Sequence, residues 1–284
     1  MNNFSIGEAW SQAAAFLSEH WKIMLILVGG SVVLGNIAQF GVFGISQEAM
    51  SAQMTAAMRT GNMQNFLATM APKLGGAAFV AGVIQSIGQF ASLRVAFSRG
   101  EEEVGSALGY GVVAALVSFL FWAVLTFVFV AIFAVILIAL GVSGGALANG
   151  DTSGMAALVG TLVILVLLIL PVMLYIGARL WVMAPAMADA RSANPIYGLT
   201  ESWRLTRPSQ WPLVGYLLLI GVATIFVFGL LGAVTGFITS MFGSTVGPMV
   251  QSIVTGVPST ILAIAISAGV YRALVPTDDG DIFA

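Results

Sequence analysis

The sequence predicts an all-α integral membrane protein with six transmembrane helices in three parallel repeats, each an interfacial helix plus a two-span hairpin. Three observations predict this fold class. Hydrophobic residues make up 59% of the chain and charged residues only 8%, whereas soluble domains carry about 25% charged residues. Apolar runs are long and lack in/out alternation, which favours helices over a barrel. The basic residues, finally, lie almost entirely on one side of the apolar pattern.

Six apolar segments are long enough to cross the roughly 30 Å hydrocarbon core of a bilayer as helices. We expect these spans at Ile23–Phe43, Leu74–Phe97, Leu116–Leu140, Leu158–Met183, Leu213–Phe237 and Val250–Leu274. Glycines spaced by four, such as Gly105 and Gly109 or Gly232 and Gly236, predict places where helix backbones approach closely.

The positions of Lys and Arg predict the orientation. Of ten basic residues, only Arg59 and Lys73 fall on one side of the six spans. The other eight are Lys22, Arg94, Arg99, Arg179, Arg191, Arg204, Arg207 and Arg272. Because basic residues accumulate on the cytoplasmic side of a membrane, we expect both termini in the cytoplasm.

A unit of about 95 residues recurs along the chain. Its markers are an early glycine, an aromatic residue near the start of the next span, and an arginine at the end of each even span. The glycines are Gly7, Gly105 and Gly198, the aromatics Trp21, Phe119 and Trp211, and the arginines Arg94, Arg179 and Arg272. We therefore expect a single membrane domain over residues 1–284, with units near 1–100, 101–193 and 194–284.

The first interfacial helix is predicted to be amphipathic. Phe4, Trp10, Ala13, Ala14 and Leu17 share one face of it. Such a helix either lies in the headgroup plane with its aromatic side down or packs as an elbow against the bundle.

Groups that carry chemistry are scarce in this sequence. All twelve Asp and Glu residues lie outside the six spans, His20 is the single histidine, and cysteine is absent. A His-Glu-x-x-His zinc site is therefore excluded, and no Gly-x-x-x-x-Gly-Lys phosphate loop occurs. A net charge of −2 without a basic block argues against nucleic acid as a partner. We expect no enzyme activity and no catalytic, cofactor-binding or metal-binding residues.

Two groups of residues are candidates for binding. Arginines on the inner side either hold anionic lipid headgroups or only set the topology; they are Arg94, Arg179, Arg191, Arg204 and Arg207. Among them, Arg179, Arg204 and Arg207 are predicted to share one basic patch. Uncharged polar residues in the spans either line a cavity or form hydrogen bonds between helices; they are Asn36, Gln39, Gln85, Gln89, Thr255 and Ser259. Asn36 and Gln85 fall at comparable depth, so they are predicted to pair across the first hairpin.

Residues 196–207, which end in Ser202-Trp203-Arg204-Leu205-Thr206-Arg207, precede Trp211 and an apolar run. This stretch resembles the elbow of the glycerophosphodiester phosphodiesterase membrane-domain family, multi-span bacterial membrane proteins, and residues 181–186 are also similar. The resemblance implies the bacterial inner (cytoplasmic) membrane. A soluble phosphodiesterase domain in some relatives needs a pair of histidines and metal-binding carboxylates. With one histidine here, the resemblance implies no hydrolase activity.

Together these observations predict a non-catalytic integral inner-membrane protein with a scaffold, assembly or lipid-interacting role. Its expected partners are membrane lipids and a protein partner or a second copy of the chain. The alternative is a small transporter or channel subunit that uses the uncharged polar residues in the spans.

Overall fold

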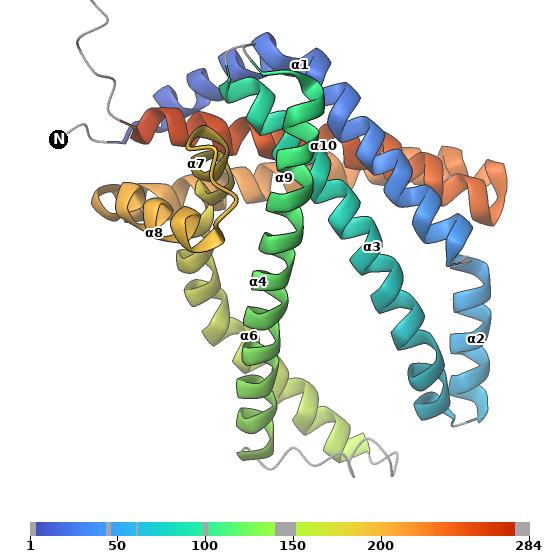
Figure 1. Cartoon of the computed structure of the whole chain (residues 1–284). Coiled ribbons are helices and arrows are strands. Elements are labelled where there is room, and N and C mark those ends of the chain that lie inside the picture. Colours follow the sequence, from blue (N-terminus) through green and yellow to red (C-terminus); the bar gives the residue numbers. More distant parts are fainter. Residues whose placement is uncertain (1–3, 44–46, 61, 99–101, 140–151, 276–284) are drawn as a thin grey trace, which may run out of the picture.

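The computed structural model describes residues 4–43, 47–60, 62–98, 102–139 and 152–275, which are almost entirely helical and contain no strand (Figure 1). The long helices are α1 (Ile6–Asn36), α3 (Met63–Phe97), α4 (Val104–Ala139), α6 (Thr152–Leu180), α9 (Gln210–Thr239) and α10 (Gly243–Leu274). Shorter helices are α2 (Gln47–Thr60), α7 (Met183–Asp189) and α8 (Pro195–Thr206). A π-helical turn (Ile37–Val42) extends α1, and two 3₁₀ turns, Arg207–Ser209 and Ser240–Phe242, flank α9.

The predicted fold class is confirmed. Six helical stretches of the described chain are long and apolar enough to cross a membrane. They involve α1, α3, α4, α6, α9 and α10, each of which overlaps one of the six predicted spans; Leu140, the predicted end of the third span, lies outside the described residues. The protein is therefore a multi-pass, all-α membrane protein.

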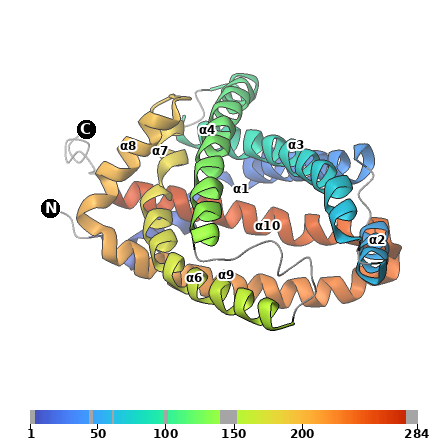
Figure 2. The same ribbon diagram turned by 90° about the horizontal axis from the view of Figure 1, so that it is seen from below.

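Helices α1 and α10 form an antiparallel pair at the centre of the fold. Figure 1 and Figure 2 show α1 and α10 along one another, with α3 and α9 beside this pair. Helix α4 packs on α3, and α6 packs on α9. The short helix α7 contacts α3, α10 and α8, so it joins elements that are far apart in sequence.

Two glycines allow the central helices to approach closely. A Cβ atom added to Gly269 of α10 would lie 2.5 Å from the backbone nitrogen of Ala13 in α1. A Cβ atom added to Gly88 of α3 would lie 2.6 Å from the carbonyl oxygen of Leu27, also in α1. Helix α1 is therefore held between α3 and α10 at contacts that leave no room for a side chain.

The glycine pairs that the sequence analysis singled out do not mark these contacts. An added Cβ at Gly105, Gly109 or Gly232 would meet nothing within 4 Å, and at Gly236 it would meet only the side chain of Gln251, at 3.1 Å. Spacing by four places two glycines on the same side of a helix, but it does not determine whether another helix packs on that side.

Of the three predicted interfacial helices, only the third is a separate element. Asn194 caps α8 with a hydrogen bond from the Ile196 amide at 3.0 Å, Pro195 occupies its first turn, and a 3₁₀ turn leads into α9. The corresponding segments of the first two units run without a break into α1 and α4. The threefold repeat remains a prediction.

The start of α1 packs as an elbow, on a face that overlaps the predicted one only in part. Phe4 and Ala13 are buried as predicted, together with Ala9 and Phe16, whereas Trp10 is 53% exposed and Ala14 is also exposed. The small side chain of Ala9, rather than the bulky Trp10, fits against the neighbouring helices, so the indole of Trp10 points outward.

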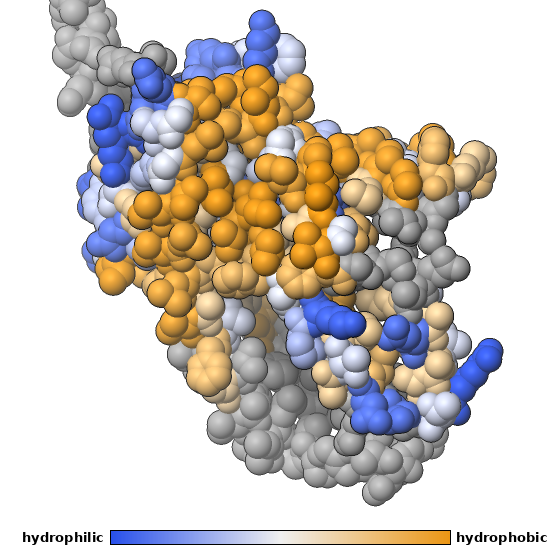
Figure 3. Space-filling view, turned by 45° about the vertical axis from the view of Figure 1, so that its right-hand side comes forward, coloured by the Kyte–Doolittle hydropathy of each residue, from blue (hydrophilic) through white to orange (hydrophobic). Residues whose placement is uncertain are grey.

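The outer surface of the spans is apolar. Figure 3 shows a broad hydrophobic area across one face of the molecule. Helix α9 contributes much of the exposed apolar surface, with Ile225, Phe226 and Phe237 each more than 70% exposed. Side chains of this kind are favourable against lipid tails and unfavourable in water.

Candidate functional site

Arg94, the first candidate arginine, lies in the last turn of α3 and is only 2% exposed. Its Nε atom lies 2.5 Å from the Glu102 carboxylate, and its Nη1 atom donates to the Ala188 carbonyl at 2.7 Å. Arg94 thus connects α3 to α7 and to the segment before α4. Burial by itself raises the pKa of Glu102, but Arg94 and a hydrogen bond from Ser106 outweigh it and hold that pKa below its usual range.

Arg179 is also turned into the protein and is 4% exposed. Its guanidinium donates to the Tyr175 hydroxyl at 2.8 Å, to the Trp203 carbonyl at 3.2 Å and to the side-chain oxygen of Gln210. It also lies over the Trp203 ring, 4.6 Å from the centroid. Arg179 therefore fastens the end of α6 to α8 and to the start of α9.

The remaining candidate arginines, Arg191, Arg204 and Arg207, are exposed. Arg204 forms an ion pair with Glu201 on the same helix, with Nε and Oε2 2.8 Å apart. Arg191 has a φ of 54°, in the left-handed region that favours glycine. Since Arg179 is buried, it does not share an exposed patch with Arg204 and Arg207. We call Arg191, Arg204 and Arg207 the basic rim.

Asn36 joins two helices, but not the two that were predicted. Its side chain donates to the Val32 carbonyl at 2.8 Å and accepts a hydrogen bond from Ser252 of α10 at 2.6 Å. The predicted hydrogen bond to Gln85 is not formed; the Gln85 amide instead lies near Gly35. The reason is that α1 packs along α10 as well as α3, which brings a competing hydroxyl to the Asn36 side chain.

Two further candidates are not among the described residues that line the groove identified below. Thr255 donates to the Gln251 carbonyl at 2.8 Å, and Gln251 in turn donates to the Gly232 carbonyl of α9 at 3.1 Å. Gln39 is partly exposed in the π-helical turn that follows α1. Together with Asn36, Thr255 is part of the hydrogen bonding within and between helices that the sequence left open as one alternative.

The last two polar candidates, Gln89 and Ser259, line an open groove of about 550 Å³. Helix α3 forms one side of this groove, the end of α6 and the start of α7 another, and α10 its floor. Its lining combines apolar side chains with a few uncharged polar ones, among them Gln89, Leu93, Trp181, Ser259, Thr260 and Ser267. Sequence analysis missed Ser267. This residue follows Thr260 by seven positions, a spacing that places both on one side of α10.

The polar side chains of the groove differ in their hydrogen bonds. Ser259 donates to the Gly256 carbonyl at 3.0 Å, and Ser267 donates to the Ile264 carbonyl at 2.9 Å. Within the part of the chain that the structure describes, the amide of Gln89 and the hydroxyl of Thr260 form no hydrogen bond. Both groups are open to the groove rather than buried, so a ligand in the groove can reach them.

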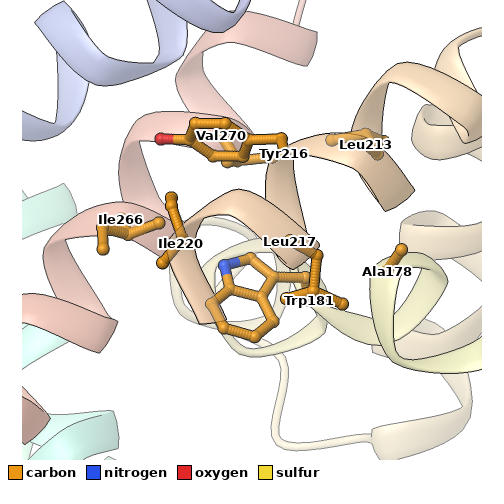
Figure 4. A pocket seen from close by; sticks show the side chains of 8 residues that line it. All are labelled: Ala178, Trp181, Leu213, Tyr216, Leu217, Ile220, Ile266 and Val270. Carbon is orange, nitrogen blue, oxygen red and sulfur yellow. The ribbon is translucent and has the colours of Figure 1, made fainter. Parts of the chain in front are cut away.

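Trp181 lines both the groove and a second, smaller cavity, whose lining residues Figure 4 shows. That cavity has a volume of only about 10 Å³ and is enclosed by apolar side chains from α6, α9 and α10 together with Tyr216. The indole N–H of Trp181 and the hydroxyl of Tyr216 are both buried without a hydrogen-bond partner in the described chain. A cavity of this volume is too small for a lipid or solute, so the larger groove is the candidate binding site.

The fold defines a multi-pass integral membrane protein, with an open groove between α3, α6 and α10. Among the described residues, no three His, Asp or Glu side chains gather where they would hold a metal ion. No family model, curated protein or solved structure matches the chain.

Proposed function

We propose that this is a non-catalytic integral inner-membrane protein that binds membrane lipids in the groove between α3, α6 and α10. One observation carries the proposal: the Gln89 amide and the Thr260 hydroxyl face a largely apolar groove, and neither forms a hydrogen bond with the described residues. An amphiphile satisfies such groups with its polar part and covers the apolar lining with its chain. The groove volume of about 550 Å³ falls within the usual range for ligand sites, roughly 300–1,000 Å³.

The basic rim supports the same role. With both termini in the cytoplasm, as the distribution of basic residues favours, Arg191, Arg204 and Arg207 lie at the inner leaflet. Each basic side chain near an anionic membrane surface contributes about 1 kcal/mol of attraction. Arg94 and Arg179 do not belong to this surface because protein groups surround them.

A scaffold or assembly role is compatible with lipid binding. The exposed apolar face of α9 offers a surface for lipid, for a protein partner or for a second copy of the chain. Membership of the glycerophosphodiester phosphodiesterase membrane-domain family, inferred from residues 196–207, fits a membrane protein that acts without its own catalytic groups.

The alternative is a small transporter or channel subunit. It is favoured by Gln85 and Gln89, which lie one turn apart on α3 and are both partly exposed. Glycerol entry into proteoliposomes, followed by light scattering, separates the two functions. Entry faster than into protein-free vesicles would support the transporter, whereas lipid binding alone predicts no difference.

Photo-crosslinking tests the proposed lipid site. We expect a phospholipid with a diazirine in its acyl chain to label peptides of α10 around Ala263, an exposed residue that lines the groove. Ala263→Phe fills the groove and should reduce this labelling several-fold, as measured by peptide mass spectrometry. The matched control is Ala223→Phe, since Ala223 is exposed on α9, away from the groove. Equal labelling in the two variants would contradict the proposal.

A further inference from the structure

We propose that the groove selects an amphiphile whose head is uncharged and carries a free hydroxyl, as in a mono- or diacylglycerol. This inference rests on the proposed function, because it names the class of lipid that the same groove binds. Three features of the lining carry it: its charge, its hydrogen bonds and its apolar part.

The described residues of the groove provide no counterion for a charged head, because none of their side chains is Lys, Arg, Asp or Glu. Arg179 lies between two lining residues in sequence, Gly177 and Leu180, but its guanidinium is occupied by Tyr175, Trp203 and Gln210 on the other side of α6. A phosphate in the groove would lose its hydration without gaining an ion pair, which is strongly unfavourable in an apolar medium.

The hydrogen-bonding groups of the groove favour a ligand that donates a hydrogen bond. The hydroxyl protons of Ser259 and Ser267 are already directed to backbone carbonyls, so these two side chains offer only oxygen lone pairs. Thr260 and the Gln89 amide both donate and accept. A hydroxyl does the same, whereas an ester carbonyl only accepts. A head with a free hydroxyl is therefore the simplest partner for all four groups.

The remaining lining is suited to an acyl chain. Leu93 of α3, Leu180 of α6 and Ile264 of α10 contribute aliphatic side chains, and Trp181 adds an aromatic one. The groove is open at its side, so a chain can enter from the bilayer without passing through the protein interior.

Competition against the photoactivatable lipid tests this inference in full-length protein held in detergent. Dioctanoylglycerol should displace the photolipid from α10 at concentrations about tenfold lower than its methyl ether, which lacks the hydroxyl proton. Dioctanoyl phosphatidylglycerol, which keeps hydroxyls but adds a charge, should also compete at least tenfold less well than dioctanoylglycerol.

Two variants connect the preference to the groove. Gln89→Leu and Thr260→Val should each reduce competition by dioctanoylglycerol to the level of its methyl ether. Thr235→Val on α9 should leave the preference for dioctanoylglycerol over the ether unchanged. Equal competition by all three compounds, or none by dioctanoylglycerol, would overturn the neutral-hydroxyl inference and leave lipid binding intact. Labelling of α10 that Ala263→Phe does not reduce would instead overturn the proposed function itself.

Discussion

At the scale of single residues, the arginines in the last turns of α3, α6 and α10 interact mainly with other groups of the protein. Arg94 and Arg179 are buried among carbonyl, hydroxyl and aromatic groups. Arg272 lies over the rings of Phe16 and Phe97, at 4.9 and 5.8 Å, and 3.6 Å from the Glu19 carboxylate. The sequence predicted that all three arginines lie at the ends of spans. It did not predict the direction of their side chains, because a long side chain can reach either water or a protein partner.

The Arg94–Glu102 ion pair yields a stability prediction. Glu102→Gln leaves a buried guanidinium without its counterion, so we expect a loss of roughly 1–3 kcal/mol in the free energy of unfolding. Glu103→Gln is the matched control, because Glu103 is the next residue and is exposed. Thermal unfolding in detergent at neutral pH measures both variants. An equal transition temperature for the two would show that the ion pair adds nothing.

The same pair predicts a pH dependence. Because the folded-state pKa of Glu102 lies below its usual range, its contribution is fully present above the unfolded-state pKa of about 4.3. It is lost as the pH falls through the lowered folded-state value. The stability difference between the natural protein and Glu102→Gln should therefore shrink steadily below about pH 4. A difference that persisted at lower pH would indicate another cause.

At the scale of helices, the packing depends on which side of a helix meets a neighbour. Gly88 and Gly269 lie at close crossings with α1, although neither was marked by the four-residue glycine spacing. In a chain with 33 glycines, spacing alone has little power to choose among them. Gly269 and Ala13 are about 250 residues apart in sequence and meet because α1 and α10 pack antiparallel. This packing determines which glycine must lack a side chain for the two backbones to approach.

Helix crossing gives a second stability prediction. Gly269→Ala brings a methyl group into the backbone of Ala13, so we expect destabilisation of roughly 1–3 kcal/mol. Gly229→Ala on α9 is the control, because nothing lies within 4 Å of its added Cβ and alanine favours a helix. Differential scanning fluorimetry in detergent should show a lower transition temperature for Gly269→Ala alone. A transition at or above that of the natural protein would mean that α1 and α10 adjust freely.

At the scale of the whole molecule, the packing of α1 on α10 brings the first and last spans together, and α7 contacts α3, α8 and α10. The groove exists only because of this arrangement, since α3, α6, α7 and α10 each contribute part of its lining. The many exposed apolar side chains on α9 are consistent with this arrangement, because a helix at the edge of a membrane bundle faces lipid.

The predicted orientation is testable because the natural chain has no cysteine. Single cysteines are introduced at Ala52, exposed on α2, and at Ala190, exposed after α7. With both termini cytoplasmic, a membrane-impermeant maleimide added to intact cells should label the first position and not the second. Labelling of the second position only would indicate the opposite topology. Labelling of both positions would contradict six simple crossings.

The sequence by itself determined the membrane class and the six spans, because transfer of a helix into lipid depends on the apolar content and length of that helix alone. It also determined that Arg94, Arg179 and Arg272 close their spans. Only the tertiary structure decided that Asn36 bonds Ser252 rather than Gln85, that two arginines turn inward, and that Gln89 and Thr260 meet in one groove. Those outcomes depend on which helix faces pack together, and lipid is as apolar as the helices themselves, so the hydrophobic pattern does not distinguish a face that meets lipid from one that meets protein.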